Sequence, residues 1–136
     1  MNTTRFKNLI MGNVFRTNTS VPIPSTYYVG LSSTEPNVSG GGVTEPSTSG
    51  TGYARVALSS LSAPSDGVIT NNSAITFPES LTSWFPAATP ATHYVIYDAA
   101  TGGNLLMYNE LVTPRIIEVS TVATIRAGSL YLQLTD

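Results

Sequence analysis

The sequence lacks cysteine altogether and contains few charged residues. With no cysteine among its 136 residues, disulfides and cysteine-ligated metal sites are excluded. Charged residues make up 10% of the chain, well below the roughly 25% that is usual for soluble domains. Because such a surface repels its neighbours only weakly, we expect a homo-oligomer or a docked subunit, with a trimer as one option.

Basic clusters and long apolar runs are also missing. The net charge is −2, and the six Lys and Arg residues are spread singly along the chain. No stretch could neutralise a row of phosphates, so we expect no nucleic-acid binding. No apolar run approaches the roughly 18 residues that a membrane helix needs, so we expect no membrane insertion.

Catalytic and metal-binding patterns are absent as well. The one histidine, His93, precedes Asp98 by five residues, and the chain has no Gly-x-Ser-x-Gly nucleophile motif. His93 has no second metal ligand at a recognisable spacing. A glycan hydrolase would need two of the eight acids paired across a sugar, and this stays the less favoured alternative. We therefore expect a non-enzymatic protein without cofactor or metal.

What the sequence does contain is a series of short β segments. Turn-forming residues separate them, including the run 98–104, which is typical of a hairpin turn rather than of a calcium loop. Helical periods between the strands are missing. The pattern predicts an all-β fold, an antiparallel β-sandwich of jelly-roll or Ig-like type with about eight strands. The predicted strands are 26–32, 53–59, 74–77, 93–98, 105–109, 115–119, 121–126 and 129–135.

One short N-terminal α-helix is predicted ahead of the strands, over residues 3–15. Thr3 or Thr4 can cap its start. Its apolar residues fall on one stripe and form the predicted docking helix: Phe6, Leu9, Ile10 and Val14. The stripe packs either on its own domain or on a partner subunit. We therefore divide the chain into a helical arm, 1–20, and a β-sandwich domain, 21–136.

A long loop from residue 33 to residue 52 carries almost no side-chain chemistry. It consists mainly of Ser, Thr, Gly and Pro, with three consecutive glycines at 40–42 and Thr-Glu-Pro at both 34–36 and 44–46. No Gly-Lys-Ser/Thr follows the glycines, so this is not a phosphate loop. Its glycines allow close approach of a second backbone, which favours docking by shape.

Aromatic residues outnumber what one small core usually takes. Neighbours in a strand point to opposite faces, so some of the tyrosines should point away from the interior. Exposed rings suit both protein interfaces and glycan binding. The candidates for such contact are Tyr27, Tyr28, Trp84, Phe85, Tyr94 and Tyr97.

These motifs, in this order, carry a family resemblance. The main segments are YVGLSSTEP at 28–36, GYARV at 52–56, NSAITFP at 72–78, HYVIYDA at 93–99 and AGSLYL at 127–132. Together they resemble a family of small bacteriophage virion proteins, usually labelled tail fiber or minor structural proteins. The chain departs from that family at Phe85, where Gly is typical, and at residues 86–92, which look like an insertion.

The resemblance implies a structural component of the virion with a β-sandwich-like fold and no catalytic residues. A tail fiber or tail appendage that docks on other virion proteins is the favoured function. A capsid head decoration protein is one alternative. The other is a carbohydrate-binding module for host attachment, which would use Trp84, Tyr27 or Tyr28 to stack on a host surface glycan.

Overall fold

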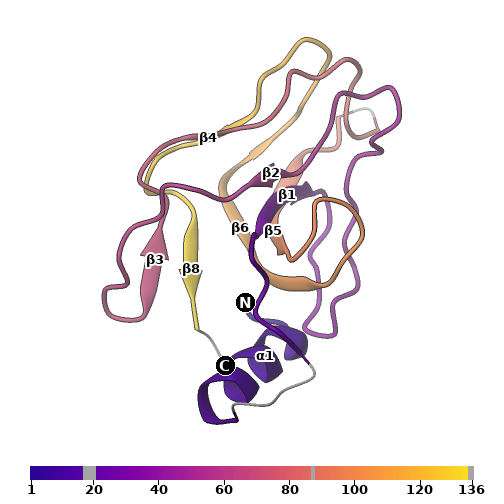
Figure 1. The fold of residues 1–136 in the computed structure, drawn as a ribbon. Helices are drawn as coiled ribbons and strands as arrows, with labels where there is room; N and C mark the ends of the chain where they lie inside the picture. Colours follow the sequence, from indigo (N-terminus) through magenta and orange to yellow (C-terminus); the bar gives the residue numbers. More distant parts are fainter. Residues whose placement is uncertain (17–20, 87, 135–136) are drawn as a thin grey trace.

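The described part of the chain is built from one helix and eight short strands. The computed structural model describes residues 1–16, 21–86 and 88–134. Helix α1 (Thr4–Phe15) comes first (Figure 1). The strands are β1 (Tyr28–Ser32), β2 (Val56–Ala57), β3 (Val68–Thr70), β4 (Ile75–Thr76), β5 (Ala91–Tyr97), β6 (Leu105–Arg115), β7 (Thr124–Ile125) and β8 (Tyr131–Gln133). No described helix is long and apolar enough to span a membrane.

The strands form one four-stranded sheet and two small ladders, and all their pairings are antiparallel. The sheet has the order β2-β1-β5-β6. β3 pairs with β8, and β4 pairs with β7 (Figure 1). The predicted all-β, sandwich-like fold with a short N-terminal helix is therefore confirmed.

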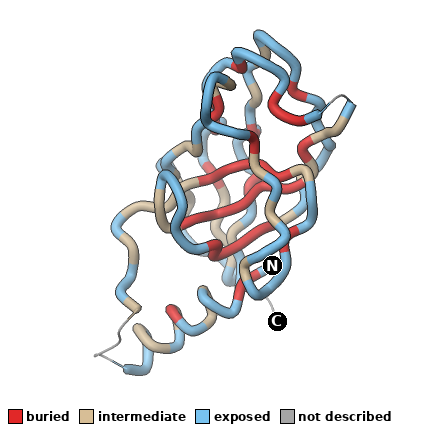
Figure 2. Tube along the Cα trace, turned by 90° about the vertical axis from the view of Figure 1, so that its right-hand side faces the viewer, coloured by how far each residue is buried: buried red, intermediate tan, exposed pale blue. Residues whose placement is uncertain are grey.

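The main core lies on one face of the four-stranded sheet. Strand alternation places Val29 and Leu31 of β1 beside Tyr94 and Ile96 of β5 on this face. The same cluster includes buried residues from the two ladders and from the segments beside them: Ile75, Phe77, Ile125 and Leu130. The buried part of the trace runs through the middle of the molecule (Figure 2). Each large side chain buried in this way contributes about 1.5–3 kcal/mol.

The opposite face of the sheet is also covered. Val95 and Tyr97 of β5 form a second buried cluster with Leu105 and Tyr108, and Val43 from the loop 33–52 packs against it. The hydroxyl of Ser32 accepts a hydrogen bond from the Thr44 N–H (3.0 Å), which ties the loop back to β1. The loop therefore serves as a second layer over the sheet.

Two strand predictions need correction. The predicted strand 115–119 is wrong, because only Arg115 belongs to a strand. Beyond it the chain turns to bury Ile117, whose carbonyl accepts the Trp84 N–H (3.1 Å) instead of a ladder bond. Strand β3 was not predicted, since it is only three residues long and follows directly on a turn.

Strand β6 bulges before it ends. His93 pairs with Glu110 and Ala91 pairs with Arg115, so two steps along β5 correspond to five steps along β6. The extra residues leave the ladder, and Val112 among them is 82% exposed. The bulge directs the end of β6 toward β7.

The first three residues run along the edge of β6. The Thr3 N–H donates to the Leu106 carbonyl (2.9 Å), and the Tyr108 N–H donates to the Met1 carbonyl (3.0 Å). Thr3 then caps α1, because its hydroxyl accepts a hydrogen bond from the Phe6 N–H (3.3 Å). The predicted cap is confirmed. The predicted arm boundary at residue 20 falls outside the described residues and stays a prediction.

The double role of Thr3 leads to a stability prediction. Its hydroxyl caps α1 and also donates to the Leu105 carbonyl (2.7 Å) in the interior. We expect Thr3→Ala to lower the free energy of unfolding by about 1–2 kcal/mol in chemical denaturation. The matched control is Thr4→Ala, at an exposed position, which should change it by less than about 0.5 kcal/mol. Equal effects of the two changes would contradict the assignment of the cap.

Candidate functional site

A charged network around Arg55 joins three separate segments. Its guanidinium binds both carboxylate oxygens of Glu45, at 3.0 Å from Nε and 2.7 Å from Nη2. It also lies 3.5 Å from the centre of the Tyr97 ring. Its Nη1 donates to the carbonyls of Ala99 (2.8 Å) and Gly102 (2.7 Å). One side chain therefore connects the loop 33–52, strand β5 and the β5–β6 hairpin.

Tyr53 extends this network to β1. Its hydroxyl donates to Glu45 Oε2 (2.5 Å) and accepts from the Leu31 N–H (3.1 Å), just beyond the last residue of β1 that pairs with β2. A Cβ on Gly30 would lie 2.5 Å from the Tyr53 hydroxyl and 2.8 Å from Glu45 Oε2, so a larger residue there would displace these groups. Gly30 thus makes room for the network on the face of the sheet.

The pKa shifts in the network indicate a structural role. Burial, and then the charge of Glu45, raise the pKa of the Tyr53 phenol. Burial alone would lower the pKa of Arg55, but the hydrogen bonds and charge of Glu45 outweigh it and raise that pKa. The phenol therefore stays protonated and the guanidinium stays charged at neutral pH. All three side chains bind one another or the backbone, so the cluster fixes the fold.

Most of the predicted contact aromatics lie inside the protein. Trp84 packs edge-on against Tyr53, with ring centroids 5.1 Å apart, and its Nε1 donates to the Thr51 carbonyl (2.9 Å). Phe85, Tyr94 and Tyr97 are buried as well. Of the six candidates, the structure leaves Tyr27 and Tyr28 half-buried, within reach of a partner.

The predicted docking helix divides between the interior and the surface. Leu9 is only 2% exposed and packs within the protein, whereas Phe6 and Ile10 are half-buried. Val14 is 65% exposed, and beside it on α1 Phe15 is 74% exposed. The helix therefore contacts its own domain at its start and presents apolar side chains at its end.

An apolar hollow of about 390 Å³ opens beside α1. Its walls include residues from the helix, from the segment before β1 and from β8 and the residue after it: Phe6, Ile10, Tyr27, Leu132 and Leu134. We call this hollow, together with the exposed Met11, Val14 and Phe15, the α1 surface. Sequence reasoning found its helical part but missed Leu132 and Leu134, which reach it only through the pairing of β8 with β3.

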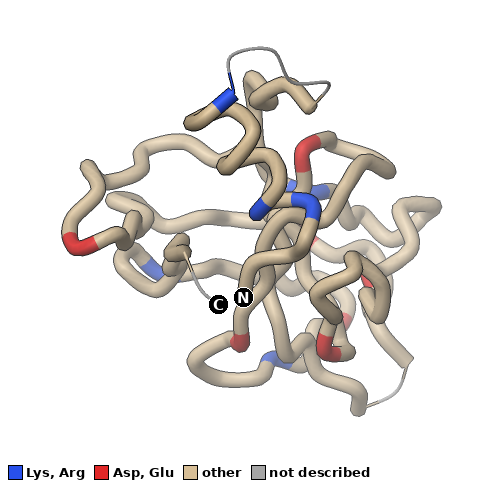
Figure 3. Tube along the Cα trace, turned by 90° about the horizontal axis from the view of Figure 1, so that it is seen from below, with Lys and Arg blue, Asp and Glu red and all other residues tan. Residues whose placement is uncertain are grey.

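The residues considered for catalysis or metal binding do not form a cluster. His93 is buried, and its Nδ1 lies 2.8 Å from the Thr92 hydroxyl. Asp98 accepts the Asn104 N–H (2.7 Å), which confirms the predicted hairpin turn. Burial alone would raise the pKa of Asp98, but its hydrogen bonds from Asn104 hold that pKa below its usual value. The described acidic residues are spread over several loops and strand β6 (Figure 3). Among the described residues, no three His, Asp or Glu side chains come together as a metal site.

Comparison with protein families gives a match over nearly the whole chain. A family model described as Podophage GP4 fiber I protein gp80 matches residues 2–133. The matched range includes α1, the eight described strands, the Arg55 network and all of the α1 surface except Leu134. Among curated proteins, none matches the chain significantly.

The Arg55 network leads to a second stability prediction. We expect Arg55→Met to lower the free energy of unfolding by about 2–3 kcal/mol, because Glu45 loses its cation and two carbonyls lose their donor. Chemical denaturation at pH 7 measures this. The control Arg16→Met, at an exposed position, should change it by less than about 0.5 kcal/mol. A loss no larger than that of the control would show that the network does not hold the loop.

The raised pKa of Tyr53 predicts sensitivity to alkali. Above the usual tyrosine value of 10.0, the unfolded chain releases its phenol proton while folded Tyr53 retains it. The contribution of Tyr53 to the free energy of unfolding is therefore complete below pH 10 and falls as the pH rises above 10. Denaturation curves from pH 8 to 11.5 should show this fall. Tyr53→Phe should be less stable at pH 8, yet lose up to about 1.4 kcal/mol less per pH unit above pH 10. Parallel curves for the two proteins would contradict the assignment.

Proposed function

The chain belongs to the podophage fiber family described as Podophage GP4 fiber I protein gp80, and from this premise we propose that it is a non-enzymatic subunit of the phage tail fiber that associates with copies of itself and docks on other virion proteins. A protein of this family is a structural component of the virion. Docking and self-association are the parts of the proposal that rest on the physical argument below.

The α1 surface is the observation that carries the docking proposal. Val14 and Phe15 are more than half exposed, although water disfavours apolar side chains of this size. Val14 follows Ile10 by one helical turn, and Ile10 lines a hollow whose walls are mostly apolar. A contiguous apolar surface of this kind typically marks a protein interface. We infer that an apolar segment of another virion protein fills the hollow and covers the end of α1.

The low charge of the chain supports self-association. Only 14 of its residues, six basic and eight acidic, carry a formal charge, and two of these neutralise each other as Arg55 and Glu45. Little electrostatic repulsion therefore opposes close contact between copies. A trimer is one arrangement that fits this proposal.

The family match favours the tail fiber over a capsid head decoration protein. The α1 surface would serve either position on the particle, so the geometry of the site does not distinguish them. Host attachment through stacked aromatic rings would draw on Tyr27 and Tyr28, since Trp84 lies in the interior. Tyr27 also lines the hollow beside α1, which favours a protein contact for this residue.

Substitutions at the end of α1 test the docking proposal. Deleting the whole arm would also remove Thr3 and Leu9, which are buried, so single changes are cleaner. We expect Phe15→Asp to reduce the amount of the protein in purified phage particles more than about tenfold, because a carboxylate would be buried in an apolar interface. Quantitative mass spectrometry of particles that carry the variant measures this.

The matched control is Val119→Asp, at a position on another surface that is 59% exposed. It should leave incorporation unchanged. Sedimentation velocity on both purified variants separates a loss of self-association from a loss of docking. Incorporation of the Phe15→Asp protein at the control level would overturn docking through the α1 surface.

A further inference from the structure

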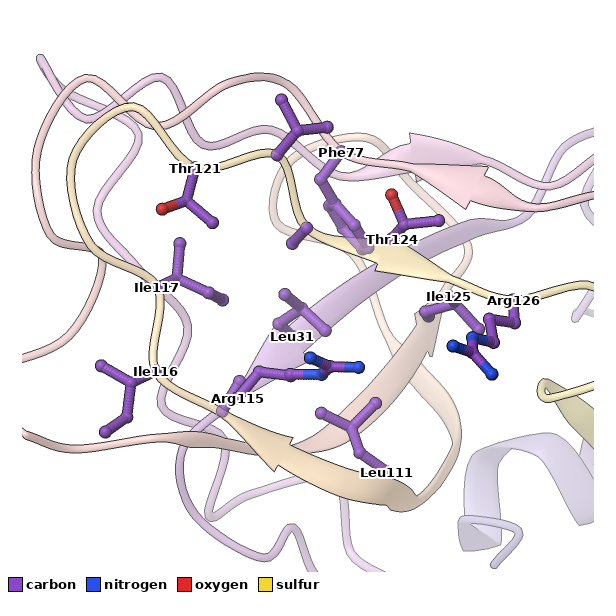
Figure 4. Close-up of a pocket in the computed structure, with 13 residues that line it drawn as sticks. Leu31, Phe77, Leu111, Arg115, Ile116, Ile117, Thr121, Thr124, Ile125 and Arg126 are labelled. Carbon is purple, nitrogen blue, oxygen red and sulfur yellow. The ribbon is translucent and has the colours of Figure 1, made fainter.

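Two adjoining hollows lie between the end of β6 and β7. Their volumes are about 290 Å³ and about 260 Å³, and they share part of their lining. Arg115 at the end of β6 and Arg126 just after β7 line both of them. Figure 4 shows the two side chains at the first hollow, with Leu111 and Ile125 lying between them.

The charge at these hollows is not neutralised. Neither hollow is lined by an acidic residue. Within residues 1–16, 21–86 and 88–134, neither guanidinium has a hydrogen bond or an ion pair, in contrast to Arg55. The chain has only six basic residues, and two of them, both exposed, line the same two hollows. Like charges so placed repel each other, and a bound anion would relieve that repulsion.

The remaining lining has the chemistry of a sugar site. Thr113, Thr124 and Ser129 contribute hydroxyl groups, which have no hydrogen bonds in the described part of the chain. Leu111 and Ile125 provide an aliphatic patch beside them. Free hydroxyls pair with ring hydroxyls, and an aliphatic surface suits the C–H face of a sugar. A guanidinium binds a carboxylate through two parallel hydrogen bonds.

We propose that the two hollows together bind a carboxylated saccharide, with Arg115 and Arg126 holding its carboxylates and Leu111 and Ile125 contacting its rings. The unpaired hydroxyls favour a saccharide over an acidic protein segment, which would leave more of them unmatched. The site is independent of the docking proposal, because the α1 surface shares no residue with it.

Calorimetric titration of the full-length chain tests this site. The probes are an oligogalacturonate, a neutral galactose oligosaccharide of the same length, and a glutamate-rich peptide of matching charge. We expect only the oligogalacturonate to bind, with an affinity that falls as salt rises. Arg115→Gln and Arg126→Gln should each weaken binding about tenfold, the low end for a charge-assisted hydrogen bond. The double variant should show no binding.

The control is Arg16→Gln, which removes an exposed positive charge that lines neither hollow. It should bind like the unaltered protein. All three single variants should keep the thermal midpoint of the unaltered protein, so a lost signal reports on binding and not on unfolding. No binding of the oligogalacturonate, equal binding of the neutral sugar, tighter binding of the peptide, or full affinity in the double variant would each overturn the proposal.

Discussion

The arrangement of this protein depends on the bidentate ion pair between Arg55 and Glu45. The loop 33–52 has almost no apolar side chains that could hold it against the sheet, and ordering each residue costs about 1–2 kcal/mol of backbone entropy. Its attachments include the ion pair of Glu45, the packing of Val43, the buried Pro36 and Pro46, and the hydrogen bond from the Thr44 N–H to Ser32. Through Tyr53 the same carboxylate reaches β1, and through Arg55 it reaches the β5–β6 hairpin. The ion pair is therefore the contact that joins the loop to both β1 and the β5–β6 hairpin.

This attachment explains which predictions from the sequence succeeded. The cap at Thr3, the hairpin turn at Asp98 and the overall β pattern are local features, set by residues close in sequence. Tyr94 and Tyr97 lie in different buried clusters on opposite faces of β5, as the alternation of a strand requires. Their exposure could not be inferred, because the loop 33–52 covers the second face, and long-range contacts such as the pair of Glu45 and Arg55 hold it there.

The few charges of the chain fall into two classes with different consequences. Arg55 makes four hydrogen bonds, two to Glu45 and two to backbone carbonyls, so it contributes to the fold. The guanidinium groups of Arg115 and Arg126 have no hydrogen bond or ion pair among the described residues, and both line the same two hollows. In a chain where charge is scarce, unpaired like charges add little to folding stability, which favours a role outside folding.

Strand β6 connects the two surfaces on which the functional proposals rest. Its first half pairs with Met1 and Thr3, which position the start of α1, and its last residue is Arg115. The bulge between these halves turns the strand out of the sheet, so the two surfaces belong to different parts of the subunit. This strand therefore keeps the proposed docking surface separate from the proposed anion-binding surface. Occupation of either surface then leaves the other open.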